Sequence, residues 1–168
     1  MVVALAVVIF GFMLAEARRA ERNERTQRAR GGIEPPADSA VFAAMRVVYP
    51  AAFLSMLVER ALRGSPDQDA FVIGAAMYVA AKALKWWAIL ELGPFWTFRV
   101  IVIPGARLVR SGPYRYMRHP NYVGVFGELL GTALMTGALI AGPIATLLFT
   151  SLMLRRSVVE DRALDAAR

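Results

Sequence analysis

Apolar residues gather along the chain in five blocks, which charged or Gly/Pro-rich segments separate. The blocks cover residues 1–15, 39–58, 70–92, 121–141 and 144–154, and the run from Tyr122 to Leu154 holds one charged residue, Glu128. Long apolar blocks with so few charges are typical of membrane-spanning helices. The pattern therefore predicts an all-α fold, a polytopic integral membrane helical bundle of about five transmembrane helices. We expect a single domain over residues 1–168.

Turn residues and capping side chains predict where the first four helices begin and end. The charged stretch 16–30 follows the first block, and the Gly and Pro residues at 31, 32, 35 and 36 break any helix there. Asp38 or Ser39 can cap the second helix, and Pro50 is expected to kink it. Residues 59–69 are expected to form a polar loop, and Asn121 is the expected N-cap of the fourth helix.

The fourth and fifth blocks are expected to form a hairpin, with Gly142 and Pro143 as the turn. The fifth block is too short to span alone, because its residues rise about 16 Å against a hydrocarbon core of roughly 30 Å. We therefore expect its helix to continue into the polar tail, residues 155–168. Gly124, Gly127 and Gly131 form a ridge of small residues that could bring helices close together within or between subunits.

Composition and charge narrow the possible chemistry. The chain is 57% hydrophobic, above the 45–50% or so of soluble domains. It has no cysteine and one histidine, which excludes disulfides, a Cys nucleophile and a multi-His metal centre, so no metal is expected. The net charge is +7, but most basic residues lie in 16–30, 93–120 and 155–168, which the positive-inside rule places in the cytoplasm. No nucleic-acid partner is expected.

The segment Leu108 to Gly131 carries the candidate chemistry. It places Arg115, Arg118, the only histidine and three tyrosines just before or at the start of an apolar helix. Unpaired N–H groups at a helix N-terminus beside arginines can bind an anionic group. Taken singly, each of these residues is an ordinary interface anchor, so the argument rests on the order of the whole string.

That string resembles the signature of the isoprenylcysteine carboxyl methyltransferase family, whose members are membrane enzymes that use S-adenosylmethionine. The similarity lies in Leu108–Val109, Ser111–Gly112, Tyr114 and the run from Arg118 to Gly124, followed past the last span by Arg156, Glu160, Asp161 and Leu164. The resemblance implies that segments 96–124 and 155–164 form the cofactor site. It implies cofactor contacts at Ala106, Arg107, Leu108, Val109, Tyr114, His119, Pro120, Asn121, Tyr122 and Glu160, with Arg156 facing the substrate. The family's usual second acidic residue is Glu, whereas this chain has Asp161.

Two further features bear on the mechanism. Arg156 and Glu160 are four residues apart, so they share a helix face and could serve both substrates in one pocket. Glu128 lies two turns inside the fourth span, where a carboxylate is costly. It is expected either to pair with Lys82 or Lys85 or to line the acceptor pocket as a catalytic residue, with pairing favoured. The two lysines themselves are expected to snorkel toward the interface.

The predicted function is methyl transfer from S-adenosylmethionine to a lipophilic acceptor at the interface of a bacterial inner membrane, with the cofactor site on the cytoplasmic side. The acceptor is a carboxylate of the isoprenylcysteine type or a hydroxyl of a long-chain polyketide-type lipid. Three alternatives stay open: an NADPH-dependent membrane reductase, a phospholipid N-methyltransferase and a non-catalytic membrane subunit. The expected partners are membrane lipids and a lipophilic or lipid-modified substrate.

Overall fold

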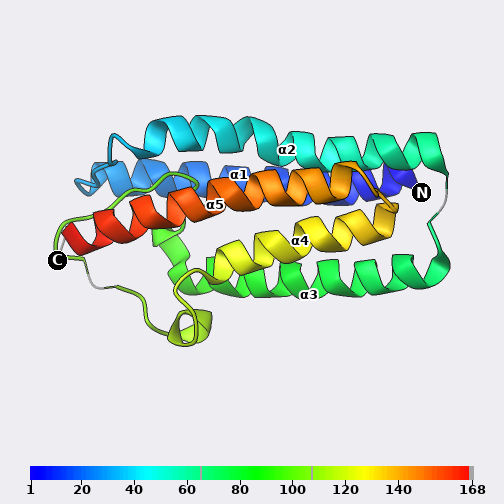
Figure 1. Cartoon of the computed structure of the whole chain (residues 1–168). Helices are drawn as coiled ribbons and strands as arrows, with labels where there is room; N and C mark the ends of the chain where they lie inside the picture. The colour runs from blue at the N-terminus through cyan, green and yellow to red at the C-terminus, as the bar shows by residue number, and fades with distance from the viewer. Residues whose placement is uncertain (65, 107, 167–168) are drawn as a thin grey trace.

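The computed structural model describes residues 1–64, 66–106 and 108–166, which form a bundle of long helices (Figure 1). The elements are α1 (Val2–Ala29), α2 (Asp38–Arg63), α3 (Gln68–Leu92), two short 3-10 helices η1 (Gly93–Phe95) and η2 (Gly112–Arg115), α4 (Pro120–Thr136) and α5 (Ala141–Ala166). Extended pairing within the described residues is limited to one bridge between Ile33 and Val102. The predicted all-α class is confirmed.

Helices α3 and α4 pack closely because glycines on each face the backbone of the other. A Cβ atom at Gly74 would lie 2.5 Å from the Met135 nitrogen, and one at Gly131 would lie 2.7 Å from the Tyr78 nitrogen. At the other end of the pair, a Cβ at Gly124 would lie 2.9 Å from that of Lys85. The predicted glycine ridge therefore brings two helices together within this chain.

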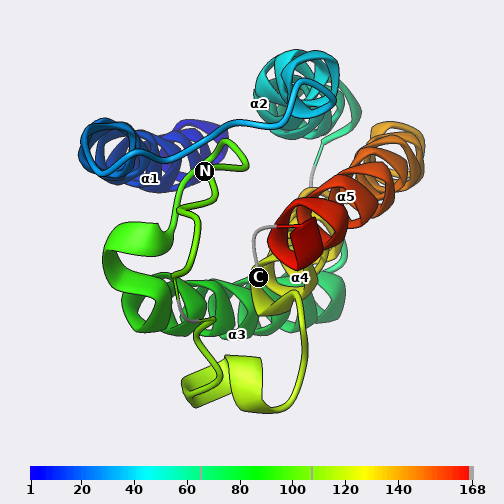
Figure 2. The ribbon, with the colours of Figure 1, turned by 90° about the vertical axis from the view of Figure 1, so that its left-hand side faces the viewer.

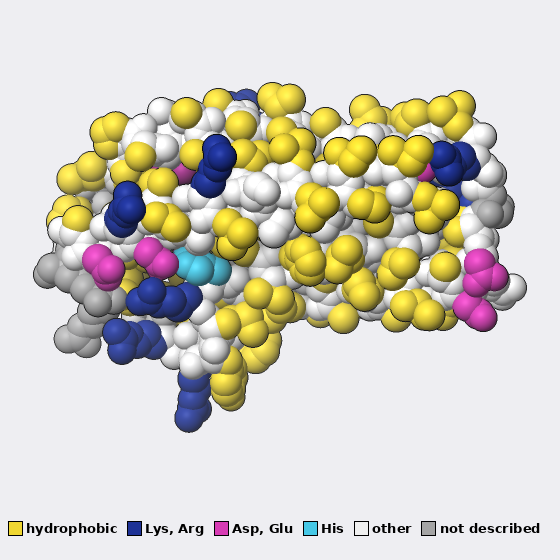
Figure 3. Space-filling view, in the orientation of Figure 1, with side chains coloured by type: hydrophobic (Ala, Val, Ile, Leu, Met, Phe, Trp, Pro, Cys, Tyr) yellow, Lys and Arg dark blue, Asp and Glu magenta, His cyan; other side chains and the backbone are white. Residues whose placement is uncertain are grey.

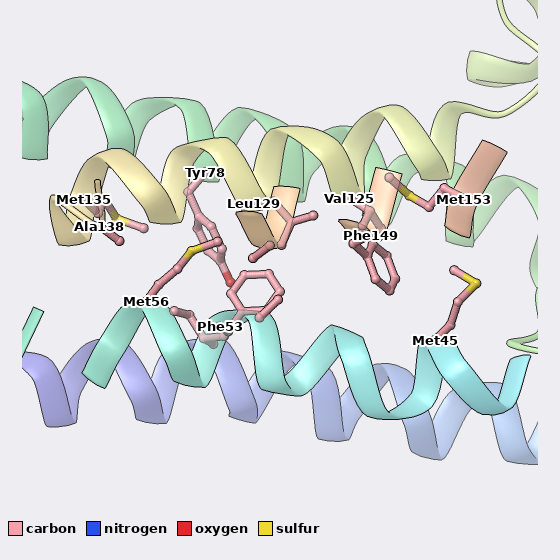
Figure 4. Packing of buried hydrophobic residues seen from close by; sticks show 13 residues of the cluster. Met45, Phe53, Met56, Tyr78, Val125, Leu129, Met135, Ala138, Phe149 and Met153 are labelled. Atoms are coloured by element: carbon pink, nitrogen blue, oxygen red, sulfur yellow. The ribbon is translucent and has the colours of Figure 1, made fainter. Parts of the chain in front are cut away.

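The main core lies between α2, α4 and α5, and α3 contributes from the top of the view in Figure 4. Phe53 and Met56 of α2 face Leu129 of α4 and Phe149 of α5, and all four are buried. Tyr78 of α3 reaches into the same layer. This layer holds the two halves of the bundle together over much of their length.

Helix α1 is much longer than the block 1–15 predicts, and the charged stretch 16–30 is helical almost to its end. Ala and Arg are strong helix formers, and one side of this stretch is buried against the rest of the molecule. Glu16, Ala20 and Gln27 are all buried there. The helix ends at Ala29, just before the expected break at Gly31 and Gly32, so the polarity of residues 16–30 does not end it.

Several other expected limits are also wrong. Helix α2 continues to Arg63, so the polar loop is shorter than 59–69. His119, not Asn121, is the N-cap of α4, with Pro120 at the first helical position, which suits proline's fixed φ. Helix α4 ends at Thr136, because Gly137 adopts a left-handed conformation with φ of 63°. The turn therefore precedes Gly142, which lies in the first turn of α5.

Two helical segments are long and apolar enough to cross a membrane, Asp38–Arg63 and Gln68–Phe95. The count of about five spans is not confirmed: α1 is charged in its second half, α4 has 17 residues, and α5 ends in a polar turn. Apolar side chains cover much of the long flank in Figure 3, whereas the end that carries the histidine also carries acidic and basic side chains. The predicted continuation of the last helix into the tail is confirmed.

Candidate functional site

The segment that joins α3 to α4 folds across one end of the bundle, where the end of α1 holds it. The Asn23 side-chain amide donates to the carbonyl oxygens of Gly93 and Trp96, at 3.0 and 2.7 Å. One turn later, the Gln27 amide donates to the Pro94 carbonyl oxygen at 3.1 Å. In the end-on view of Figure 2, this segment passes between α1 and α3. Sequence reasoning gave the second half of α1 no role beyond topology.

A cluster of ion pairs fixes the next part of the segment. Arg99 lies 2.6 Å from Glu34 and 3.7 Å from Glu24, and Arg28 lies 2.5 Å from Glu34. Burial alone would raise the pKa of Glu34, but hydrogen bonds from Arg99 and Arg28 bring that pKa below its usual value. Burial raises the pKa of Glu24. These contacts hold the linker before α2 against the segment that follows α3.

The start of α4 and the end of α5 meet at the same end of the bundle. The His119 ring stacks on the Tyr122 ring, with centroids 5.3 Å apart and planes 18° apart. The Tyr122 hydroxyl donates to Glu160 at 2.9 Å, and Asp161 lies 3.4 Å from His119 Nε2. Asn121 accepts a hydrogen bond from the Trp96 indole at 3.4 Å. Both segments to which the resemblance assigns the cofactor site therefore lie together.

Arg156 lies one turn before Glu160, and it is buried. Its guanidinium donates to the Phe98 carbonyl oxygen, and its Nε lies 3.5 Å from an Asp38 carboxylate oxygen. The other Asp38 oxygen accepts from the Val100 amide at 2.9 Å. Arg156 and Glu160 line one cavity, as their shared face predicts, but the ion-pair partner of Arg156 is Asp38.

A cavity of about 1220 Å³ lies beside these residues. Its walls come from α1, α2, the segment after α3, and the facing turns of α4 and α5. Burial and the negative charges of Glu160 and Glu91 raise the pKa of Tyr114, which lies on its wall. Most of the predicted site residues line this cavity: Ala106, Leu108, Val109, Tyr114, His119, Asn121, Tyr122, Arg156 and Glu160. Pro120 is buried at the start of α4, and Arg107 lies outside the described residues.

Glu128 belongs to a buried ion cluster that links α1, α3 and α4. Lys82 lies 3.0 Å from Glu16 and 2.8 Å from Glu128, whereas Lys85 lies 2.7 Å from Glu16 and 3.4 Å from Glu128. The Tyr49 hydroxyl donates to Glu128 at 2.6 Å. The favoured pairing of Glu128 with the lysines is confirmed. The snorkelling expectation for both lysines is wrong, because a buried partner, Glu16, approaches from α1.

Comparisons with known proteins identify the family of this chain. The model of the isoprenylcysteine carboxyl methyltransferase (ICMT) family matches residues 73–166. The chain is similar to the uncharacterized protein YpbQ of Bacillus subtilis, with 30% identity over 152 residues, which cover 90% of this chain and 89% of YpbQ. It is also similar to an uncharacterized protein of Haemophilus influenzae, with 24% identity over 145 residues, covering 86% and 83% of the two chains. No solved structure matches. The chain belongs to the isoprenylcysteine carboxyl methyltransferase family of membrane methyltransferases.

Proposed function

We propose that the protein transfers a methyl group from S-adenosylmethionine to an oxygen of a lipophilic acceptor, at the cytoplasmic interface of a bacterial inner membrane. The observation that carries this proposal is the meeting of His119, Tyr122 and Glu160 on the wall of the large cavity. These residues come from two segments that are far apart in sequence and belong to the family signature. Two helices long and apolar enough to cross a membrane support the location.

The chemistry of the cavity wall suits this cofactor. The amino-acid end of S-adenosylmethionine carries an ammonium and a carboxylate. On the cavity wall, Glu160 and Asp161 can bind the ammonium, and the N-terminus of α4 can bind the carboxylate. Among the described residues, His119 Nε2 is a buried nitrogen without a hydrogen bond. Tyr114 and Tyr122 add flat apolar faces for a nucleobase. The residues present therefore fit the cofactor that the family uses.

When bound, S-adenosylmethionine supplies a sulfonium-activated methyl group, whose transfer depends mainly on alignment. The Tyr122 hydroxyl orients the Glu160 carboxylate, and stacking on Tyr122 fixes the His119 ring. Arg156, held by Phe98 and Asp38, presents fixed positive charge to the part of the cavity that receives the acceptor. The segment after α3 lines the end of the cavity.

The test is calorimetric titration of the purified protein in lipid nanodiscs with S-adenosylhomocysteine and, separately, with NADPH. We expect binding of the first only. Glu160→Gln should weaken that binding at least tenfold, because hydrogen bonds to charged groups contribute about 1.5–3 kcal/mol. Asp69→Asn removes the same charge from an exposed position at the other end of α3 and should have no effect.

Other outcomes would identify a different function. Binding of NADPH without S-adenosylhomocysteine would indicate a reductase, and binding of neither would indicate a non-catalytic subunit. If the cofactor binds, transfer to lipids that co-purify with the protein can be followed by mass spectrometry. An amine acceptor must be neutral to attack, so activity that rises steeply with pH would favour N-methylation over transfer to a carboxylate.

A further inference from the structure

A short lobe projects from the bundle beside the end of α3. It comprises residues 110–118, which include η2, and we name it the η2 lobe. In both Figure 1 and Figure 2 it lies on the far side of α3 from α1 and α2, outside the outline of the long helices. Its first turn packs on α3, because a Cβ atom at Gly112 would lie 2.6 Å from the Glu91 carboxylate. The lobe therefore extends sideways at the end of the bundle that carries the cavity.

Apolar side chains are exposed where the lobe and α3 meet. Tyr116 of the lobe is 74% exposed, and Met117 is exposed beside it. Trp87 and Glu91 are four residues apart on α3, so Trp87 lies on the helix face that contacts the lobe, one turn farther along the bundle. Trp87 is 48% exposed, and Leu90 is exposed as well. Figure 3 shows hydrophobic side chains on the side of the lobe that faces the long apolar flank.

The opposite side of the lobe is basic. The lobe has the sequence RSGPYRYMR, with three arginines and no acidic residue. Arg118 lies 3.6 Å from Asp161, whereas Arg110 and Arg115 form no ion pair with the residues that the structure describes. Both are exposed, and Figure 3 shows basic side chains at the tip of the lobe and on the side away from the flank. Two positive charges are therefore available to an external anion.

This division into an apolar and a basic side matches the layers of a membrane surface. The segment Gln68–Phe95, which the lobe joins at one end, is long and apolar enough to cross a membrane. Trp and Tyr are enriched at the level of the lipid headgroups, and arginines just beyond that level attract anionic lipids. An acidic soluble protein would account for the arginines alone, because it would leave the exposed Tyr116 and Trp87 unexplained.

We infer that the η2 lobe lies on the membrane surface beside α3, where Arg110 and Arg115 bind the headgroups of anionic phospholipids. Tyr116, Met117 and Trp87 contact the upper part of the acyl chains of these lipids. The inference goes beyond the proposed function and shares with it only the membrane location. Tyr114 of the same lobe lines the cavity, so this lipid contact lies next to the candidate site.

The test uses a fluorescent label on the lobe. The chain has no cysteine, so Tyr116→Cys gives one site for a thiol-reactive bimane dye. The labelled protein is placed in nanodiscs of phosphatidylcholine and phosphatidylglycerol, and either lipid is supplied with a nitroxide quencher at the top of its acyl chain. We expect quenching by both, with a relative affinity roughly fivefold or more in favour of phosphatidylglycerol, since one arginine near an anionic surface contributes about that factor. Quenching by aqueous iodide alone, or equal affinity for both lipids, overturns the inference.

A pair of double variants in the labelled protein adds a second measurement. Arg110→Gln with Arg115→Gln should bring the relative affinity close to one. Arg22→Gln with Arg30→Gln removes the same charge from exposed positions in and just after the second half of α1, and it should keep the preference. A preference that survives the first pair, or falls equally with both, overturns the inference. Titration of the parent protein with S-adenosylhomocysteine is independent of these results, and its failure to bind would overturn the proposed function instead.

Discussion

Replacement of Glu128 by Gln should destabilise the fold strongly. The change keeps the size of the side chain but removes a negative charge that lies 2.8 Å from Lys82 and 3.4 Å from Lys85. The side chain is 1% exposed, so water cannot take over the stabilisation of the lysines. Breaking a buried ion pair by removal of one partner costs about 3–5 kcal/mol. The folded-to-unfolded ratio should therefore fall by roughly two to almost four powers of ten.

The assay is equilibrium unfolding of the protein by sodium dodecyl sulfate in mixed micelles, monitored by the fluorescence of its tryptophans. Glu21→Gln is the matched control, because Glu21 pairs with Arg25 at 2.5 Å while both side chains are more than half exposed, at 62% and 76%. Such exposed pairs contribute about 0.5 kcal/mol or less. Adding Lys82→Met to Glu128→Gln removes the unpaired charge and should recover part of the loss. Equal effects of the two Gln variants would refute the reasoning.

Three further predictions concern other parts of the molecule. Gly131→Ala should destabilise the protein by about 1–3 kcal/mol in the same assay, because the new Cβ would lie 2.7 Å from a backbone nitrogen of α3. Gly11→Ala is the control and should not destabilise it, because a Cβ at Gly11 would meet only open space. The pKa of Glu34 is lowered in the folded state, so its stabilisation is present above its usual pKa of 4.5 and is lost as the pH falls through the folded value. Replacing Glu34 by Gln should flatten that part of the stability profile, and an unchanged profile would contradict the assignment. A single cysteine at Arg110 should react with a membrane-impermeant maleimide only from the cytoplasm, and one at Asp69 only from outside; the reverse pattern would contradict the predicted orientation.

The grouping of the signature residues around the cavity could be predicted from the sequence because much of the relevant information is local. The residues His119 and Tyr122 are one turn apart at a helix start, and Arg156 and Glu160 are one turn apart near a helix end. Helical periodicity alone places each pair on one face. The signature then indicates that both faces belong to one cavity, and the stacked ring of His119 and the hydrogen bond from Tyr122 to Glu160 agree with that.

The contribution of α1 could not be predicted in the same way. A hydropathy pattern describes each residue by its own polarity, and Glu16 looks like the first residue of a soluble linker. Its burial depends on Lys82 and Lys85, which lie more than sixty residues away, so only the three-dimensional arrangement shows that these charges cancel. For the same reason, the lysines looked solvated when considered alone. Asn23 gave no signal either, because its partners are backbone carbonyls of the segment after α3.

The two sides of the cavity also differ in how they relate to the family. The family model matches residues 73–166, which include the segments that bring His119 and Glu160 together. Other residues that line the cavity, such as Met13 and Tyr49, lie on α1 and α2, outside that match. The residues that fit the cofactor lie inside the match, whereas α1 and α2, which line another part of the cavity, lie outside it. We therefore expect exchange of residues 1–63 between members to change acceptor preference while S-adenosylhomocysteine affinity is retained, and a loss of that affinity with unchanged acceptor preference would contradict this division.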